Sequence, residues 1–237
     1  MREQNGMWWG GGSYSLGGRP SPHVAGPGRE FMARHRQDGP VADLGVWEGR
    51  NLATLLTFGV PVIATDTPEA REIVLKTQQQ YPMVRFIEAP LNQLPFANGE
   101  IGGALSWRVL HNLTGDEELV PALVDINRVL TPQAPLLIAV RSEHQFDHWA
   151  TQRAFVRRLP NGNGGIREDV YFTRGGLIFM SELLGFLVER VIEDVEGGEE
   201  VDGKPVKNHY LVAHLVKSAE SRRGHQDVAK RLIVRVE

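Results

Sequence analysis

Apolar and amphipathic stretches alternate through the first 140 residues of the chain. Short apolar runs predict buried strands over residues 41–45, 60–66, 84–88, 101–107 and 135–140. Segments with helical spacing follow them, from about residue 50 to 56, 68 to 80 and 116 to 130, and another is predicted over 29–37. The helical spacing is plainest at Leu119, Leu123, Ile126 and Leu130. Strands that alternate with helices predict a parallel sheet with right-handed crossovers.

The pattern changes after residue 140. The sequence predicts a helix over 143–159, a break at 160–165 and another helix over 175–184. Two strand-like runs, 186–193 and 209–217, flank a polar, glycine-rich turn at about 197–205, which is typical of a hairpin. The expected fold is therefore α/β, with a mostly parallel sheet that ends in an antiparallel hairpin.

Three segments of different character divide the chain. Residues 1–28 are rich in glycine and proline and carry Trp8, Trp9 and Tyr14, so we expect an arm that serves as a hydrophobic clasp or as a lid over a site. Residues 29–217 form the expected domain. Residues 218–237 form a charged tail with an apolar patch, which we expect to be an appendage or an oligomer contact, as in a homodimer.

Composition narrows the classes of function. The 237 residues include 26 basic and 29 acidic ones, for a formal net charge of −3, which favours neither nucleic acid nor an anionic membrane as a partner. There is no cysteine, which excludes disulfides, thiolate nucleophiles and cysteine zinc ligands. No signal peptide or membrane-spanning run is visible, so a cytoplasmic location is expected.

Candidate chemistry lies where the predicted strands end, because ligands of open parallel sheets bind beyond the carboxyl ends of the strands. A turn with Gly45, Trp47 and Gly49 follows the first strand. The second strand ends at Asp66, 23 positions after Asp43, where an acid can accept hydrogen bonds from a ribose diol. Thr67 then precedes Pro68 as a candidate helix N-cap.

Together these pieces resemble the class I S-adenosylmethionine-dependent methyltransferases, especially small-molecule enzymes of the ubiquinone/menaquinone and tellurite-resistance groups. The matching stretches are VADLGVWEGRNLATLL, VIATD, LNQLPFANGEIGGALSWRVLHNL and INRVL, within residues 41–140. The resemblance implies a Rossmann-like, seven-stranded sheet of order 3-2-1-4-5-7-6. It also implies S-adenosyl-L-methionine as cofactor, a small-molecule acceptor, and cofactor contacts from Asp43, Gly45, Trp47, Gly49, Asp66, Thr67, Leu91, Asn92, Ser106 and Trp107.

The chain departs from the family pattern in three places. Trp47 replaces the central glycine of the turn, Pro90 replaces an acid near the adenine, and Ile101-Gly102 replaces a phenylalanine-aspartate pair. The Trp47 ring must rotate away or fill part of the pocket. Two other functions therefore stay open, namely an inactive methyltransferase-like scaffold and a cofactor-binding enzyme with different chemistry, such as a cyclisation.

Several other polar residues carry a chemical and a structural interpretation. His111 follows the fourth strand, where family members place a catalytic base, although a structural histidine is the commoner case. His144 and His148 are four residues apart, as a metal pair would be, but a solvated helix face explains them better and no metal is expected. Arg141 follows the fifth strand and either binds an acidic substrate or pairs with Glu143.

Overall fold

The computed structural model describes residues 19–113, 118–145, 154–160, 166–201, 204–219 and 234–235. Seven strands form the main sheet, in the order β3 (Arg85–Glu88), β2 (Val62–Asp66), β1 (Val41–Leu44), β4 (Gly103–Trp107), β5 (Pro135–Arg141), β9 (Lys204–Lys217) and β8 (Phe186–Val201). The first five are parallel, and β9 is antiparallel to both β5 and β8. Counted within this sheet alone, the order is 3-2-1-4-5-7-6, as the resemblance predicts.

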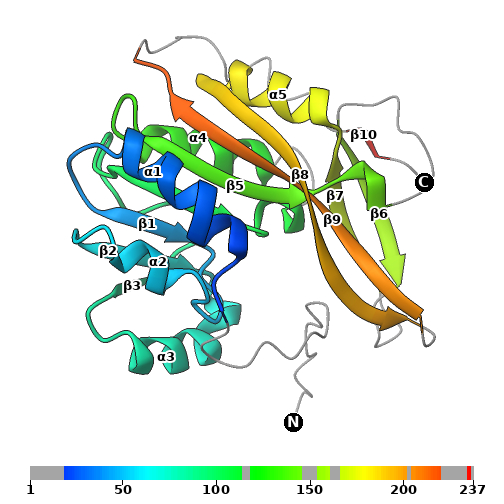
Figure 1. Ribbon diagram of the computed structural model, residues 1–237, viewed down its shortest axis with the longest axis horizontal. Helices are drawn as coiled ribbons and strands as arrows, with labels where there is room; N and C mark the ends of the chain where they lie inside the picture. The colour runs from blue at the N-terminus through cyan, green and yellow to red at the C-terminus, as the bar shows by residue number, and fades with distance from the viewer. Residues whose placement is uncertain are drawn as a thin grey trace.

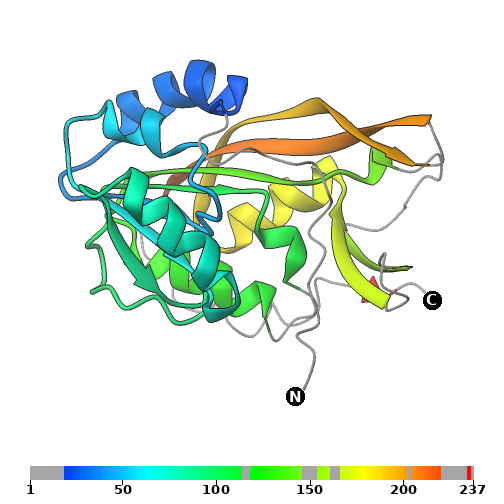
Figure 2. The same cartoon turned by 90° about the horizontal axis from the view of Figure 1, so that it is seen from below.

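Helices cover both faces of the sheet. On one face lie η1 (Val24–Gly28), α1 (Arg29–His35) and α2 (Leu52–Leu56), and on the other lie α4 (Leu119–Val129) and α5 (Arg174–Leu183) (Figures 1 and 2). Short helices η2 (Pro68–Ala70), η3 (Leu110–Asn112) and η4 (Glu143–Gln145) and the helix α3 (Arg71–Gln80) complete the described set. Each face of the sheet thus has its own hydrophobic core.

Alternation along the strands decides which core each side chain joins. In β1, Ala42 and Leu44 pack towards α4, whereas Val41 packs towards α1 and α2. The central strands are buried on both sides, because helices cover both faces, and this explains their continuous apolar runs. The helix α4 has the predicted spacing, with Leu119, Leu123 and Ile126 all buried.

The predicted helix over 143–159 is wrong in its second half. Residues Ala154–Pro160 form strand β6, which pairs with β7 (Ile166–Phe172) and with β10 (Val234–Arg235) in a separate three-stranded sheet. The glycine- and asparagine-rich segment 160–165 joins two strands rather than ending a helix, and this is a hairpin signal. His148 and Trp149 lie outside the described residues.

The predicted hairpin is present but its turn is much shorter than expected. β8 continues to Val201 and β9 begins at Lys204, so most of the segment 197–205 is paired strand. An irregularity between Gly197 and Glu200 accommodates the glycines within the ladder. The long hairpin extends past the central strands, on the side where the small sheet lies (Figure 1).

The described part of the N-terminal segment packs against the domain. Ser21 and Val24 are buried, and the amide of Ser21 donates to Oδ1 of Asn51 at 3.2 Å. Trp8, Trp9 and Tyr14 lie outside the described residues, so the clasp and lid hypotheses and the division of the chain into three segments stay predictions. Within the described residues, no helix combines the length and the apolar character needed to cross a membrane.

Candidate functional site

The turn after β1 has an unusual backbone. Gly45, Trp47 and Gly49 all have positive φ values, of 85°, 47° and 68°. Such left-handed values are uncommon for residues with a side chain, and a bulky residue there is strained. Trp47 therefore keeps the backbone conformation of the glycine that it replaces, and its side chain is half-buried.

The two glycines are also required by close packing. A Cβ at Gly45 would lie 2.3 Å from a methyl group of Val109, and a Cβ at Gly49 would lie 2.4 Å from one of Thr77. The turn is thereby pressed against the loop after β4 on one side and against α3 on the other. Their contact with a cofactor stays a prediction.

Asp66, at the end of β2, holds this turn in place. Its Oδ2 accepts a hydrogen bond from the Trp47 amide at 2.7 Å, and its Oδ1 accepts one from the Thr67 amide at 2.8 Å. Thr77 Oγ1 donates to the Trp47 carbonyl at 3.1 Å and holds the following peptide group. Burial raises the pKa of Asp66, while the two amide bonds oppose that shift. Each carboxylate oxygen keeps a further lone pair for a ligand hydroxyl.

Asp43 is buried deep in the sheet beneath the turn. Its Cα pairs with Ala64 of β2 and Leu105 of β4, and the residue is 3% exposed. Burial, followed by the charge of Asp66, raises the pKa of Asp43 to about 7. A buried carboxyl that titrates near neutrality responds strongly to any cation placed beside it.

Ser106 and Trp107, predicted together at the cofactor's methionine end, point to opposite faces of the sheet. Trp107 packs towards α1 and stacks on the ring of His23, with centroids 5.9 Å apart. Ser106, its neighbour in the strand, alternates to the α4 side. Within the described part of the chain, the Trp107 Nε1 and the Ser106 Oγ are buried without a hydrogen-bond partner. An unpartnered indole N–H at this edge suits a ligand acceptor.

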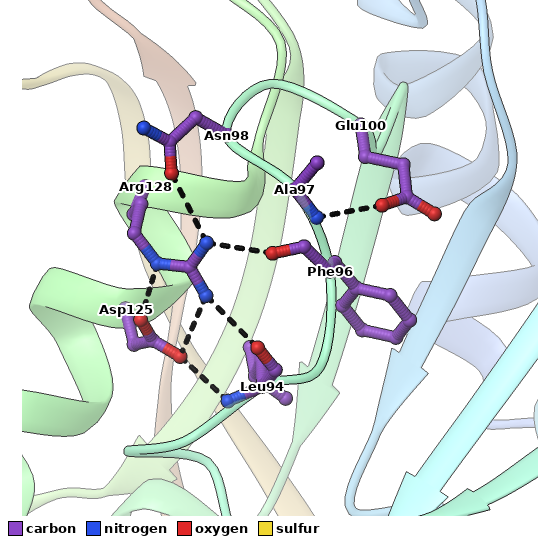
Figure 3. A network of polar contacts seen from close by, with 7 residues as sticks. All are labelled: Leu94, Phe96, Ala97, Asn98, Glu100, Asp125 and Arg128. Atoms are coloured by element: carbon purple, nitrogen blue, oxygen red, sulfur yellow. Dashed lines mark hydrogen bonds and ion pairs between the residues drawn. The ribbon is translucent and has the colours of Figure 1, made fainter.

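The loop after β3 is held by one arginine from α4 (Figure 3). Arg128 donates to the carbonyls of Leu94 and Phe96 at 2.9 and 2.6 Å and to Asn98 Oδ1 at 3.1 Å. Its Nε pairs with Asp125 at 2.6 Å, and Asp125 also accepts from the Leu94 amide at 2.6 Å. The hydrogen bond to Asp125 raises the pKa of Arg128. Sequence reasoning gave Arg128 no role, although it lies within the quoted INRVL.

This clamp positions the predicted adenine-lining pair. Leu91 is 5% exposed and joins the core with Leu94 and Phe96, whereas Asn92 is half-buried. Thr67 is half-buried beside Asp66 and occupies the predicted N-cap position before Pro68, with an extended backbone but without a side-chain capping hydrogen bond. Its backbone amide donates to Asp66.

The loop after β4 carries two residues of interest. His111, the predicted catalytic residue, lies in η3, is 3% exposed, and has its ring 6.1 Å from that of Tyr210. Arg108 has a φ of 64°, and its guanidinium lies over the Tyr210 ring at 4.0 Å. A strained non-glycine residue at a strand end is typical of functional sites, and this signal is invisible in the sequence.

His23 and His214 form a buried pair that sequence reasoning also missed. Their Nε2 atoms are 2.8 Å apart, and the His214 ring stacks on Phe31 at 4.5 Å. Burial lowers the pKa of both rings, for His214 to about 4. The pair connects the N-terminal segment to β9 directly beside Trp107.

No metal centre emerges from the described residues, where no group of three or more suitable side chains converges. His144 lies in η4, and its Nδ1 is 2.7 Å from Glu193 Oε1, which His209 also contacts at 3.1 Å. A groove of about 380 Å³ lies between α1 and the start of β8, lined by Arg34, His35 and Glu189 among others. It is not at the carboxyl ends of the parallel strands.

Comparison with known proteins agrees with this geometry. Residues 42–138 match the family model described as a methyltransferase domain. No curated protein matches the chain significantly. The structure is similar to that of a S-adenosylmethionine-dependent methyltransferase from Methanosarcina mazei, with 18% sequence identity and a TM-score of 0.61. The match covers 80% of this chain and 98% of that one.

Two further solved structures have the same fold. The 1,6-didemethyltoxoflavin-N1-methyltransferase of Burkholderia thailandensis, solved with that compound and S-adenosylhomocysteine bound, has 23% identity, a TM-score of 0.57 and coverage of 82% of this chain and 78% of its own. The CcbJ methyltransferase of Streptomyces caelestis has 15% identity, a TM-score of 0.58 and coverage of 86% and 93%. The expected α/β fold and the resemblance to class I methyltransferases are confirmed.

Proposed function

We propose, from the premise that this chain carries a class I methyltransferase domain, that it transfers a methyl group from S-adenosylmethionine to a small-molecule acceptor. One observation supports this most directly. Asp66 ends β2 and binds the amide of a turn whose three key residues have left-handed backbones, so a carboxylate and an open turn adjoin at the ligand edge of the sheet.

The cofactor would be held by the residues at the ends of β1 and β2 and in the loop after β3. Asp66 accepts the ribose hydroxyls with its remaining lone pairs, and Gly45, Trp47, Gly49 and Thr67 surround that contact. Asp43 stabilises the cationic ammonium group of the cofactor through its buried charge. Leu91 and Asn92 line the adenine, and the Arg128 clamp holds their loop. Ser106 and Trp107 complete the set, with the unpartnered Trp107 N–H as a donor.

Methyl transfer asks for positioning more than for acid–base chemistry. S-adenosylmethionine, when bound, supplies a methyl group that is already reactive, so alignment with the nucleophile provides most of the rate. A base is needed only where the acceptor must lose a proton, and His111 is our candidate for that role. The Burkholderia neighbour, which binds 1,6-didemethyltoxoflavin, supports a small acceptor here. The net charge of −3 argues against nucleic acid as the substrate.

Calorimetric titration of the full chain with S-adenosylhomocysteine tests the proposal. We expect saturable binding, weakened about tenfold or more in Asp66→Asn, because an amide nitrogen cannot accept the second hydrogen bond. Glu88→Gln is the matched control, since Glu88 ends the adjacent strand opposite Asp66 and is 44% exposed. Absence of binding by both the methyl donor and S-adenosylhomocysteine would overturn the proposal.

Trp47 favours one alternative, a methyltransferase-like protein that binds a partner without catalysis. The indole replaces a glycine in the cofactor turn and remains half-buried there. This alternative predicts that the cofactor leaves the melting temperature unchanged. Cofactor binding without any methylated product would instead favour a different reaction in the same pocket, such as a cyclisation.

A further inference from the structure

A row of cationic and hydrogen-bond-donating side chains crosses the sheet beyond the cofactor half. Arg141 ends β5, and its Cα pairs with that of Tyr210 in β9. The guanidinium of Arg108, at the end of β4, lies 4.0 Å from the centre of the Tyr210 ring. The Arg108 amide donates to the Ala139 carbonyl at 3.0 Å, which joins this residue to β5 as well. Arg108, Arg141 and Tyr210 are therefore neighbours on three adjacent strands.

The surrounding structure holds Arg108 and Tyr210 in fixed positions. Arg108 adopts a φ of 64°, a conformation that costs energy for a residue with a side chain. Tyr210 is 6% exposed, and its ring receives the guanidinium on its face. The protein thus keeps a cation at the end of β4 although the backbone conformation there is unfavourable.

Charge changes sign along the ligand edge of the sheet. The ends of β1 and β2 carry Asp43 and Asp66, whereas the ends of β4 and β5 carry Arg108 and Arg141. The buried indole N–H of Trp107, on the same face, adds a donor without a partner in the described residues. In β8, which is next to β9, the residue paired with Tyr210 is the acid Asp194. The acidic half suits a cationic cofactor, and the donor-rich half suits an anion.

We propose that the acceptor carries a negatively charged group, a carboxylate, which Arg141 binds with help from Arg108. This inference rests on the proposed function, because it assigns the β4–β5–β9 end of the site to the acceptor. Arginine presents two parallel N–H donors that match the two oxygens of a carboxylate. Tyr210 holds the Arg108 guanidinium in place through its ring face.

The test uses matched pairs of probes that differ only in charge. Full-length protein saturated with S-adenosylhomocysteine is titrated calorimetrically with benzoate, phenylacetate and 4-hydroxybenzoate, and with the three corresponding carboxamides. We expect at least one carboxylate to bind about tenfold or more tightly than its amide, as a charge-assisted hydrogen-bond pair implies. Equal binding of acid and amide in every pair, or no binding of any carboxylate, would overturn the proposal.

Variants then assign the preference to a residue. Arg141→Gln should abolish the discrimination between acid and amide, and Arg141→Lys, which keeps the charge but loses the paired donors, should retain part of it. Arg34→Gln is the control, since Arg34 is 62% exposed and pairs with Glu189 away from the strand ends. Unchanged discrimination in Arg141→Gln would contradict the assignment.

The same titrations separate this inference from the proposed function. Binding of S-adenosylhomocysteine to the wild type and to Arg141→Gln reports on the cofactor half alone and should be equal. Loss of cofactor binding in the wild type would refute methyl transfer, and the acid–amide comparison would then be made on the free protein. Cofactor binding with no acid preference would refute only the anionic acceptor.

Discussion

Trp47 stands where the family motif has a glycine, but its backbone has a φ of 47°, a positive value that a glycine adopts readily. The Trp47 amide donates to Asp66 and its carbonyl accepts from Thr77, so the peptide groups on both sides of Trp47 are held. The sequence alone predicted an altered turn at this position. It could not predict a preserved backbone, because the fixing partners are 19 and 30 residues away.

This strain has a measurable consequence. Trp47→Gly and Trp47→Ala both remove the indole, but only alanine retains a Cβ at positive φ. We expect the glycine variant to be more stable by about 1 kcal/mol, because relief of the left-handed strain outweighs the entropy that glycine adds to the unfolded chain. Urea denaturation of both variants measures the difference. An alanine variant of equal or greater stability would show that the turn is unstrained.

At the scale of elements, the N-terminal segment is joined to β9 by the His23–His214 pair. Burial lowers the pKa of both rings below that of an unfolded histidine, so the unfolded chain binds more protons in acid. Stability should therefore fall as the pH drops below about 6.5 and continue to fall towards about 4, where His214 titrates in the folded protein. The charge of Asp194 opposes the lowering of the His23 pKa, whereas that of Arg190 adds to it.

Replacing both histidines tests the pair without leaving an unpartnered ring nitrogen. The His23→Phe/His214→Phe double variant should lose less stability than the wild type between pH 7 and pH 5, with a difference on the order of 2 kcal/mol. Chemical denaturation at several pH values measures both slopes. Parallel slopes would mean that the pair does not contribute to acid sensitivity.

Element by element, the sequence predicted those parts of the fold that local pattern determines. The strands ending at Asp66 and Trp107 and the helix with Leu119, Leu123 and Ile126 were recognisable from periodicity. The strand β6 was not, because residues 154–160 suit a helix and a strand equally, and only pairing with β7 decides between them. The Arg128 clamp could not be predicted either, because three of its four partners lie in the loop after β3, 30 to 34 residues away, and only Asp125 is on the same helix.

Across the whole molecule, the ligand edge combines an acidic half with a basic half, and Asp43 lies buried beneath the acidic half. Its pKa of about 7, raised by burial, means that the folded protein binds a proton that the unfolded chain releases at much lower pH. The stability that this group contributes is therefore full in acid and is lost as the pH rises from about 3.8 to about 7. A carboxyl that lowers stability at neutral pH is expected to be retained for function.

Asp43→Asn separates the two effects of this group. Because the amide is never charged, we expect the variant to be more stable than the wild type at pH 8 by roughly 2–4 kcal/mol, with the gain shrinking towards pH 5. The same variant should bind S-adenosylmethionine more weakly at pH 8, because the buried negative charge that favours a cationic ligand is gone. Thermal unfolding and calorimetry across this pH range measure both quantities. A variant that is more stable but binds S-adenosylmethionine more weakly would show that the Asp43 carboxylate favours ligand binding and disfavours folding. Destabilisation of the variant at pH 8 would instead show that the carboxylate has a structural role.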